Sequence, residues 1–181
     1  MLEAVSAAYA RISVGPPSDE TAMMGPLITA AQRERCERFV TVAEEHGGKV
    51  VVGGGRPPGL ERGYYFEPTV LDLPDNSNPA AQEEIFGPVL AVIGYKDLDD
   101  AVRIANDSVY GLAGGVYSAS LDRALAVARR IRTGSMSVNG GAPYGADLPF
   151  GGYKHSGVGR QNGTPGFDQY LEIKSLAWPK V

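Results

Sequence analysis

The segment Gln82-Glu-Glu-Ile-Phe-Gly-Pro88 holds the residues whose types best suit ligand binding, and it directly precedes an apolar run at 89–93 that predicts a buried strand. A carboxylate such as Glu84 can accept both hydroxyl hydrogens of a ribose, and an aromatic ring such as Phe86 can pack near a flat heterocycle. The alternative is a solvated acidic turn with Phe86 in the core. Residue types alone favour that alternative.

A second candidate is the glycine-rich stretch 140–166, which contains Pro149-Phe-Gly-Gly-Tyr-Lys-His-Ser-Gly157. Paired glycines let a backbone approach its neighbour closely, and Tyr144 and Phe150 could line an apolar channel for a small organic substrate. A well-packed surface loop is the alternative here. The glycines at 53–55 and 157–159 open no predicted helix, so we interpret them as turns and not as phosphate-binding loops.

The possible nucleophiles and metal ligands are few. Cys36 is the only cysteine, and it falls on the apolar face of a predicted helix, where a small buried hydrophobe is the better interpretation than a reactive thiolate. His46 ends the same helix and is interpreted as structural, while His155 lies in a polar loop. One cysteine and two distant histidines match no metal-binding pattern, so we expect no metal.

The first half of the chain predicts two helices and two strands. Apolar spacing indicates a helix over 2–12. Thr29-Ala-Ala-Gln32 is a capping-box pattern, and the helix it opens ends at Gly47-Gly48. One face of that helix carries Cys36, Phe39, Val40 and Ala43. Strands follow at 49–52 and 65–71, and the second is expected to be an edge or irregular strand because it contains Pro68.

Strands and helices alternate more clearly in the second half. Strands are predicted at 89–93, 114–117 and 135–138, with helices between them that begin after Asp97 and Ser120. Residues 170–178 alternate in polarity and predict a final strand. This order is typical of an α/β fold, a parallel sheet with a mixed edge and helices on both faces.

Composition excludes several classes of protein. The 181 residues are 43% hydrophobic and 21% charged, which is typical of one globular domain and not of a disordered chain. No apolar run approaches the roughly 20 residues of a membrane span, and no signal peptide opens the chain. The net charge of −4 leaves no basic stripe for a nucleic acid. We therefore expect a cytoplasmic protein with neither membrane nor nucleic-acid partners.

Five motifs, taken in order, resemble the C-terminal part of the NAD(P)-dependent aldehyde dehydrogenase superfamily. They are Gly25-Pro-Leu-Ile28, Gln82-Glu-Glu-Ile-Phe-Gly-Pro-Val89, Ala105-Asn-Asp-Ser108 with Tyr110-Gly-Leu112, Gly134 with Val138-Asn-Gly140, and Pro149-Phe-Gly-Gly-Tyr-Lys154 with Gly157 and Gly159-Arg160. The resemblance covers nearly the whole chain. It implies a partial catalytic domain of the aldehyde dehydrogenase type over 1–169 and, over 170–181, an oligomerisation strand that reaches a neighbouring subunit in a homodimer or larger homo-oligomer.

The family oxidises aldehydes to carboxylic acids with NAD or NADP, through a cysteine thiolate that attacks the aldehyde. By resemblance, Glu84 would hold the nicotinamide-side ribose and Phe86 would pack near the nicotinamide. Gln32 and Arg35, on the capped helix, would touch the ribose region of the cofactor.

The resemblance also implies a substrate tunnel. Ala142, Tyr144 and Phe150 match positions that line it in the family. Because Ala142 is small, the resemblance implies a tunnel with room for a bulky aldehyde.

The family's nucleophilic cysteine, its oxyanion-binding asparagine, its general-base glutamate and its main cofactor domain all lie before the part that this chain resembles, and Cys36 does not match the nucleophile. We therefore expect no catalytic residue in this chain, no more than very weak binding of NAD(P), and no activity without the missing N-terminal portion. Two alternatives remain: a non-catalytic, self-associating interaction or regulatory module of the same fold, and an unrelated α/β ligand-binding domain.

Overall fold

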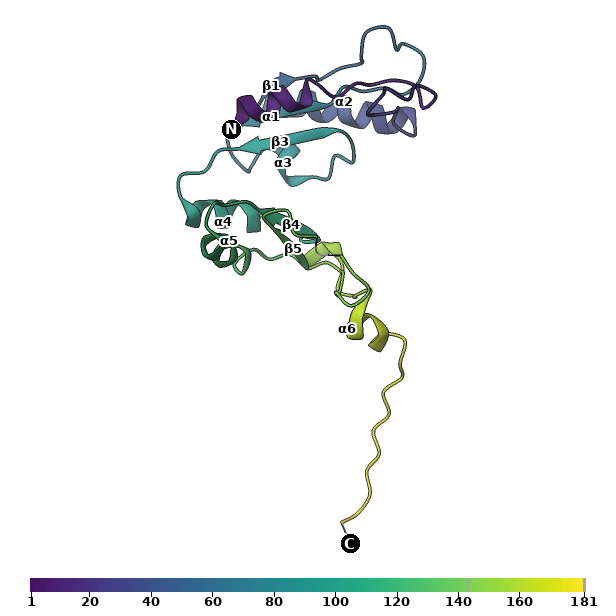
Figure 1. The fold of residues 1–181 in the computed structure, drawn as a ribbon, viewed down its shortest axis with the longest axis vertical. Coiled ribbons are helices and arrows are strands. Elements are labelled where there is room, and N and C mark those ends of the chain that lie inside the picture. The colour runs from purple at the N-terminus through teal and green to yellow at the C-terminus, as the bar shows by residue number, and fades with distance from the viewer. Residues whose placement is uncertain (143, 181) are drawn as a thin grey trace. The chain divides into compact units, whose positions relative to one another are not determined.

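The computed structural model describes residues 1–142 and 144–180, which form two units, Met1–Gly94 and Tyr95–Val181 (Figure 1). Each unit builds its own small sheet around parallel strands, with helices between the strands. The α/β class predicted from the sequence is confirmed, although the strands form two separate sheets.

The first unit holds a three-stranded mixed sheet. Its elements are α1 (Leu2–Tyr9), α2 (Ala30–Glu45), β1 (Lys49–Val52), β2 (Thr69–Leu73), α3 (Pro79–Gln82) and β3 (Val89–Ile93). The strand order is β1-β2-β3, with β1 antiparallel and β3 parallel to β2.

Helix α2 begins and ends where the sequence predicts. The Thr29 hydroxyl accepts a hydrogen bond from the backbone N–H of Gln32 at 3.2 Å. At the other end Gly47 has φ +80°, and the N–H of Gly48 donates to the carbonyl of Ala43 at 2.8 Å, which closes a Schellman motif. The side chain of Gln32 does not stay at the cap but reaches a loop described below.

The core of the first unit lies under α2. Cys36, Phe39 and Ala43 are fully buried there, as their spacing predicts, and they pack with Phe66 and Leu71. Burying a side chain as large as phenylalanine stabilises a fold by about 2–3 kcal/mol, so this face of α2 holds the helix on the sheet.

The prediction of an edge or irregular strand at 65–71 is wrong in its bounds and in its edge position, but the pairing of this strand with β1 is irregular, with a register shift between Val50 and Val52. Strand β2 begins at Thr69, immediately after Pro68, and lies in the middle of the sheet. Proline has no N–H to donate, so it is accommodated just before a central strand and not within it. Four of the five residues of β2 are buried.

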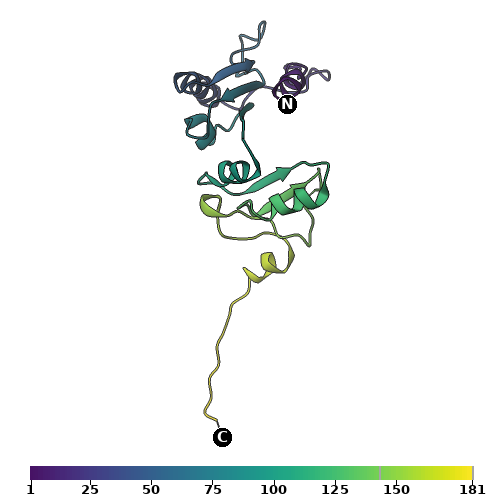
Figure 2. The same cartoon turned by 90° about the vertical axis from the view of Figure 1, so that its left-hand side faces the viewer.

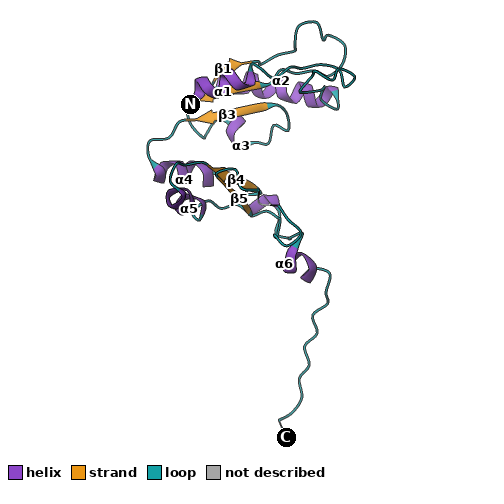
Figure 3. Ribbon diagram, viewed as in Figure 1, coloured by secondary structure: helices purple, strands orange, loops and turns teal. Residues whose placement is uncertain are grey.

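The second unit is built on a two-stranded parallel sheet (Figure 3). Its elements are α4 (Leu98–Asn106), β4 (Ala113–Val116), α5 (Leu121–Ala128), β5 (Ser135–Val138), the 3₁₀ turn η1 (Lys154–Ser156) and α6 (Gly163–Asp168). The predicted caps are confirmed: Asp97 accepts from the N–H of Asp100 at 2.9 Å, and Ser120 from that of Arg123 at 3.3 Å. Among the helices described in either unit, none has the length and apolar character to cross a bilayer.

The predicted strand at 170–178 does not form in the single chain. Residues 172–180 have no helix or strand and are exposed, and they run as an extended chain beyond α6 (Figure 2). A β-strand needs the backbone of a partner strand. Pairing of this segment with a second copy therefore stays a prediction.

Candidate functional site

The loop between α3 and β3 presents an acid and an aromatic ring to solvent. Ile85 is 7% exposed and joins the core under α2, whereas Glu84 before it is exposed and Phe86 after it is 74% exposed. Ile85 therefore anchors the loop while its neighbours face outward. The alternative interpretation, which placed Phe86 in the core, is wrong.

The backbone of this loop is held in an unusual conformation close to α2. Phe86 has φ +59°, in the left-handed region that a bulky residue rarely adopts. At Gly87, an added Cβ would lie 2.1 Å from Sγ of Cys36, so only glycine lets the loop come this near to the helix. Strain of this kind on an exposed aromatic residue is typical of functional sites.

Gln32 and Arg35, one turn apart on α2, donate to carbonyls of the same loop. Nε2 of Gln32 donates to the carbonyl of Ile85 at 3.1 Å and to that of Phe86. Nε of Arg35 donates to the carbonyl of Ile85 at 3.1 Å, and its Nη2 to that of Glu84. The structure thus brings all four residues expected at the cofactor into one patch, which we call the Glu84–Phe86 patch.

The guanidinium groups of two arginines near this patch lie over an aromatic ring. The Arg35 guanidinium lies 4.9 Å from the ring centre of Phe39, and that of Arg38 lies 4.6 Å from the same ring. Among the described residues, Arg35 donates to the main-chain carbonyl of Glu84 and not to its carboxylate, and Glu84 is exposed. The patch can therefore bind a diol beside a flat ring.

The patch has no reactive group of its own within the described residues. Cys36, which lies beneath Gly87, is fully buried, and burial raises the pKa of its thiol above the ordinary value of 9.0. A protonated, inaccessible thiol is no nucleophile near neutral pH. The prediction that Cys36 is buried on the apolar face of α2 is confirmed.

The expected tunnel residues lie in the second unit. The rings of Tyr144 and Phe150 have centroids 5.7 Å apart at 46° to each other, and Tyr144 is 64% exposed. Ala142 is exposed as well. Phe150 also lines a hollow of about 470 Å³ together with Arg160 and Tyr170. The two aromatic residues are brought together, while a tunnel role for all three stays a prediction.

Two cations that the sequence did not single out hold the glycine-rich stretch in place. Nζ of Lys154 donates to the carbonyls of Asn106 and Ser108 at 2.8 Å each, at the end of α4. Nη1 of Arg160 donates to the carbonyl of Gly152 at 2.9 Å. Lysine-to-carbonyl bonds across more than forty residues leave no local signal in the sequence. These bonds fix the backbone around Gly152 and Lys154, close to Phe150 in the sequence.

Within the described residues, no group of three or more His, Cys, Asp or Glu side chains lies close enough together to hold a metal ion.

Comparison with known proteins gives one consistent result. The model of the aldehyde dehydrogenase family matches residues 1–176. A Mycobacterium tuberculosis aldehyde dehydrogenase solved in complex with NAD⁺ superposes with a TM-score of 0.92 at 46% identity, over 98% of this chain and 37% of that one. A Staphylococcus aureus betaine aldehyde dehydrogenase in complex with NAD⁺ superposes with a TM-score of 0.90 at 40% identity, over 94% of this chain and 34% of that one.

A curated relative agrees with these structures. A Staphylococcus saprophyticus protein carrying the name "Putative aldehyde dehydrogenase" is 45% identical over 97% of this chain. The chain spans 37% of that relative's length.

Proposed function

Because the chain belongs to the aldehyde dehydrogenase family, we propose that it supplies the nicotinamide-ribose side of the cofactor site and one wall of the substrate tunnel in an NAD(P)-dependent enzyme that oxidises an aldehyde to a carboxylic acid. NAD or NADP, when bound, supplies the hydride acceptor. The residues described above bind and orient, and the reacting thiol belongs to the remainder of such an enzyme.

One observation carries this proposal: Glu84 and Phe86 are both exposed, on either side of the buried Ile85. A carboxylate accepts two hydroxyl donors at once, so Glu84 suits the diol of a ribose. Phe86, held two residues further on, offers an apolar face for the nicotinamide ring. Gln32 and Arg35, which already contact this loop, lie where they could also touch the ribose region.

The tunnel wall is proposed from the second unit. Tyr144 and Phe150 form an aromatic pair, and Ala142, two residues before Tyr144, is exposed and small. We propose that these three residues contact the organic part of the aldehyde, with room for a bulky one.

The chain alone is proposed to be catalytically inactive and to bind NAD(P) very weakly at most. Its single cysteine is Cys36, which the fold buries under Gly87, so the covalent route through a thiolate is closed within this chain. The proposed activity needs the part of the family's length that this chain does not span. We expect the assembled enzyme in the cytoplasm.

A chimera tests the proposal. This chain replaces the matching segment of the Mycobacterium tuberculosis relative, and NAD⁺ reduction is followed with several aldehydes. Glu84→Gln weakens a charge-assisted pair of hydrogen bonds and is expected to lower kcat/KM for NAD⁺ about 10- to 100-fold. Phe86→Ala should also lower it.

Glu83→Gln is the matched control, since Glu83 is the adjacent exposed carboxylate. It is expected to leave kcat/KM for NAD⁺ unchanged. Equal effects of Glu83→Gln and Glu84→Gln, or no effect of either, would contradict the assignment.

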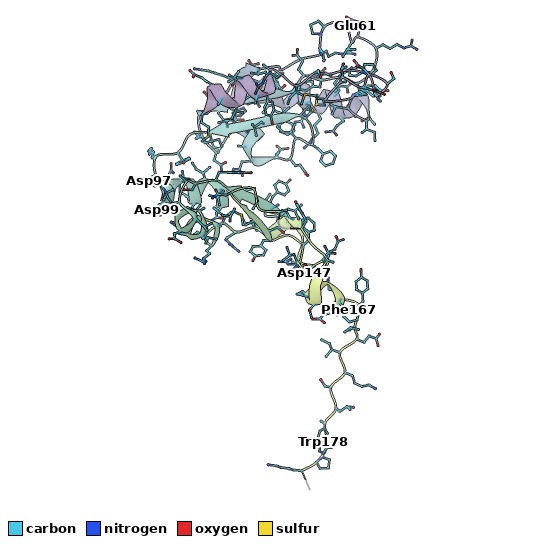
Figure 4. The ribbon with its side chains drawn as sticks, in the orientation of Figure 1. Glu61, Asp97, Asp99, Asp147, Phe167 and Trp178 are labelled. Carbon is cyan, nitrogen blue, oxygen red and sulfur yellow. The ribbon has the colours of Figure 1, made fainter. Side chains whose placement is uncertain are left out.

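The exposed C-terminal segment favours a second candidate, a self-associating module. Ile173 is 97% exposed and Trp178 79% exposed (Figure 4), and large apolar side chains of this kind seldom remain uncovered along an extended segment. We propose a homodimer or larger homo-oligomer through residues 170–178. Light scattering should report it, and a chain ending at residue 169 should be monomeric. A monodisperse monomer of the full chain would contradict it.

A further inference from the structure

We infer that Gln32 and Arg35 are positioning residues that hold the backbone of residues 84–86, so that Glu84 and Phe86 already face the cofactor side before any cofactor arrives. This inference rests on the function proposed for the Glu84–Phe86 patch. In this inference Gln32 and Arg35 hold the loop backbone even when no cofactor is bound. That role is separate from any direct contact of their side chains with the ribose.

The hydrogen bonds constrain successive peptide planes. Each peptide group is rigid, so a donor that fixes a carbonyl oxygen also fixes the orientation of its plane. Gln32 and Arg35 together engage the carbonyls of three consecutive residues, Glu84, Ile85 and Phe86. With three planes held, the directions in which the side chains of Glu84 and Phe86 leave the backbone are set.

The conformation that is held would not be favoured by the loop alone. Phe86 at φ +59° carries strain of about 1–2 kcal/mol, and an exposed ring gains little packing in return. The residues on either side of Phe86 are held by packing: Ile85 is buried in the core, and Gly87 lies close to Cys36. The donors from α2 therefore stabilise the segment between these two residues.

The donors are themselves ordered. Both lie on a sixteen-residue helix that is capped at Thr29, and both side chains are half-buried. The guanidinium of Arg35 rests on the ring of Phe39, which restricts its rotamers. Little side-chain entropy remains to be lost when a ligand binds, which is how preorganisation raises affinity.

Limited proteolysis of the full, cofactor-free chain tests the inference. A glutamyl endopeptidase cleaves after Glu83 and Glu84 only when the loop opens, whereas the exposed Glu61 (Figure 4), in the loop after β1, provides an internal reference. The measured quantity is the rate of cleavage after Glu83 and Glu84 divided by the rate of cleavage after Glu61. Each variant removes two hydrogen bonds to the loop, so Gln32→Met and Arg35→Met should each raise this ratio by at least about tenfold.

Two further variants make the result specific. Arg35→Lys retains a charged donor and should restore part of the wild-type ratio. Arg38→Met removes the other arginine from the Phe39 ring but no donor to the loop, and should leave the ratio unchanged. If Arg35→Met unfolds the chain because the stacking on Phe39 is lost, Gln32→Met still tests the inference. The hydrogen bonds of the Gln32 side chain are to the loop carbonyls.

The chimera gives the second readout. If the patch is preset by α2, Gln32→Met and Arg35→Met raise KM for NAD⁺ and leave kcat unchanged, and Arg35→Lys recovers part of the loss. A cleavage ratio that stays at its wild-type value in both methionine variants overturns the positioning role. A chimera whose KM for NAD⁺ is insensitive to Glu84→Gln overturns the proposed function instead, so the two failures are distinguishable.

Discussion

Replacing Gly87 by alanine places a methyl group against Cys36, and the structure allows its cost to be worked out. The new Cβ would lie 2.1 Å from Sγ of Cys36, whereas non-bonded heavy atoms rest about 3.5–4.0 Å apart. The loop and α2 must therefore separate by about 1.5 Å. Because Cys36 is fully buried in a packed core, we expect a destabilisation of about 3 kcal/mol, at the upper end for overpacking.

A double-mutant cycle isolates the contact responsible. Cys36→Ala removes the sulfur and should cost about 1 kcal/mol alone. In the double variant the added Cβ meets only Cβ of residue 36, at an ordinary 3.8 Å. The double variant should then be no less stable than Cys36→Ala, which gives a coupling of about 3 kcal/mol between the two positions.

Urea unfolding followed by circular dichroism provides the free energies. Gly25→Ala serves as the control, because nothing lies within 4 Å of its added Cβ, and it should change stability by less than about 0.5 kcal/mol. Additive effects of Gly87→Ala and Cys36→Ala would refute the geometry on which the patch depends.

Three other predictions concern the same unit. Asn78 is buried, donates to the carbonyl of Ala43 at 3.0 Å and accepts from the N–H of Ala80 at 3.0 Å, so Asn78→Ala should cost about 2–4 kcal/mol in urea unfolding, and a change below 0.5 kcal/mol would count against this account. Burial raises the pKa of Cys36 in the fold, so its contribution to stability is complete below the unfolded-state pKa and is lost as pH rises through the folded-state value. The free energy of unfolding should therefore fall above about pH 9, and it should fall less in Cys36→Ala. Iodoacetamide should modify Cys36 in the folded chain at least about 100-fold more slowly than in the unfolded chain. Equal rates of modification would contradict burial of the thiol.

The helices were the most predictable part of the fold, because their signals are local. Thr29, Asp97 and Ser120 each cap the helix that the sequence assigns to them. A cap acts on an N–H three residues away, so its effect can be deduced from a short stretch of chain.

The sheet was less predictable, because pairing depends on distant residues. Pro68 indicated an edge or irregular strand, yet β2 begins one residue later and lies between β1 and β3. The segment 170–178 has the polarity of a strand but no partner backbone within the described part of its own chain. Spacing gives the face of a strand and not its neighbours.

The candidate site divides in the same way. The resemblance pointed to Glu84 and Phe86 where residue types alone did not, and the structure shows both exposed. The contacts of Gln32 and Arg35 with the loop carbonyls span about fifty residues and could not be deduced from spacing. The packing of α2 against this loop could therefore not be predicted from the sequence.

Side-by-side assays of NAD⁺ reduction test the central claim most directly. The isolated chain and the chimera with the Mycobacterium tuberculosis relative are each given NAD⁺ and a panel of aldehydes. We expect turnover by the chimera and none by the chain alone. Reduction of NAD⁺ by the purified chain alone, or a correctly folded chimera that cannot bind NAD⁺, would contradict the account.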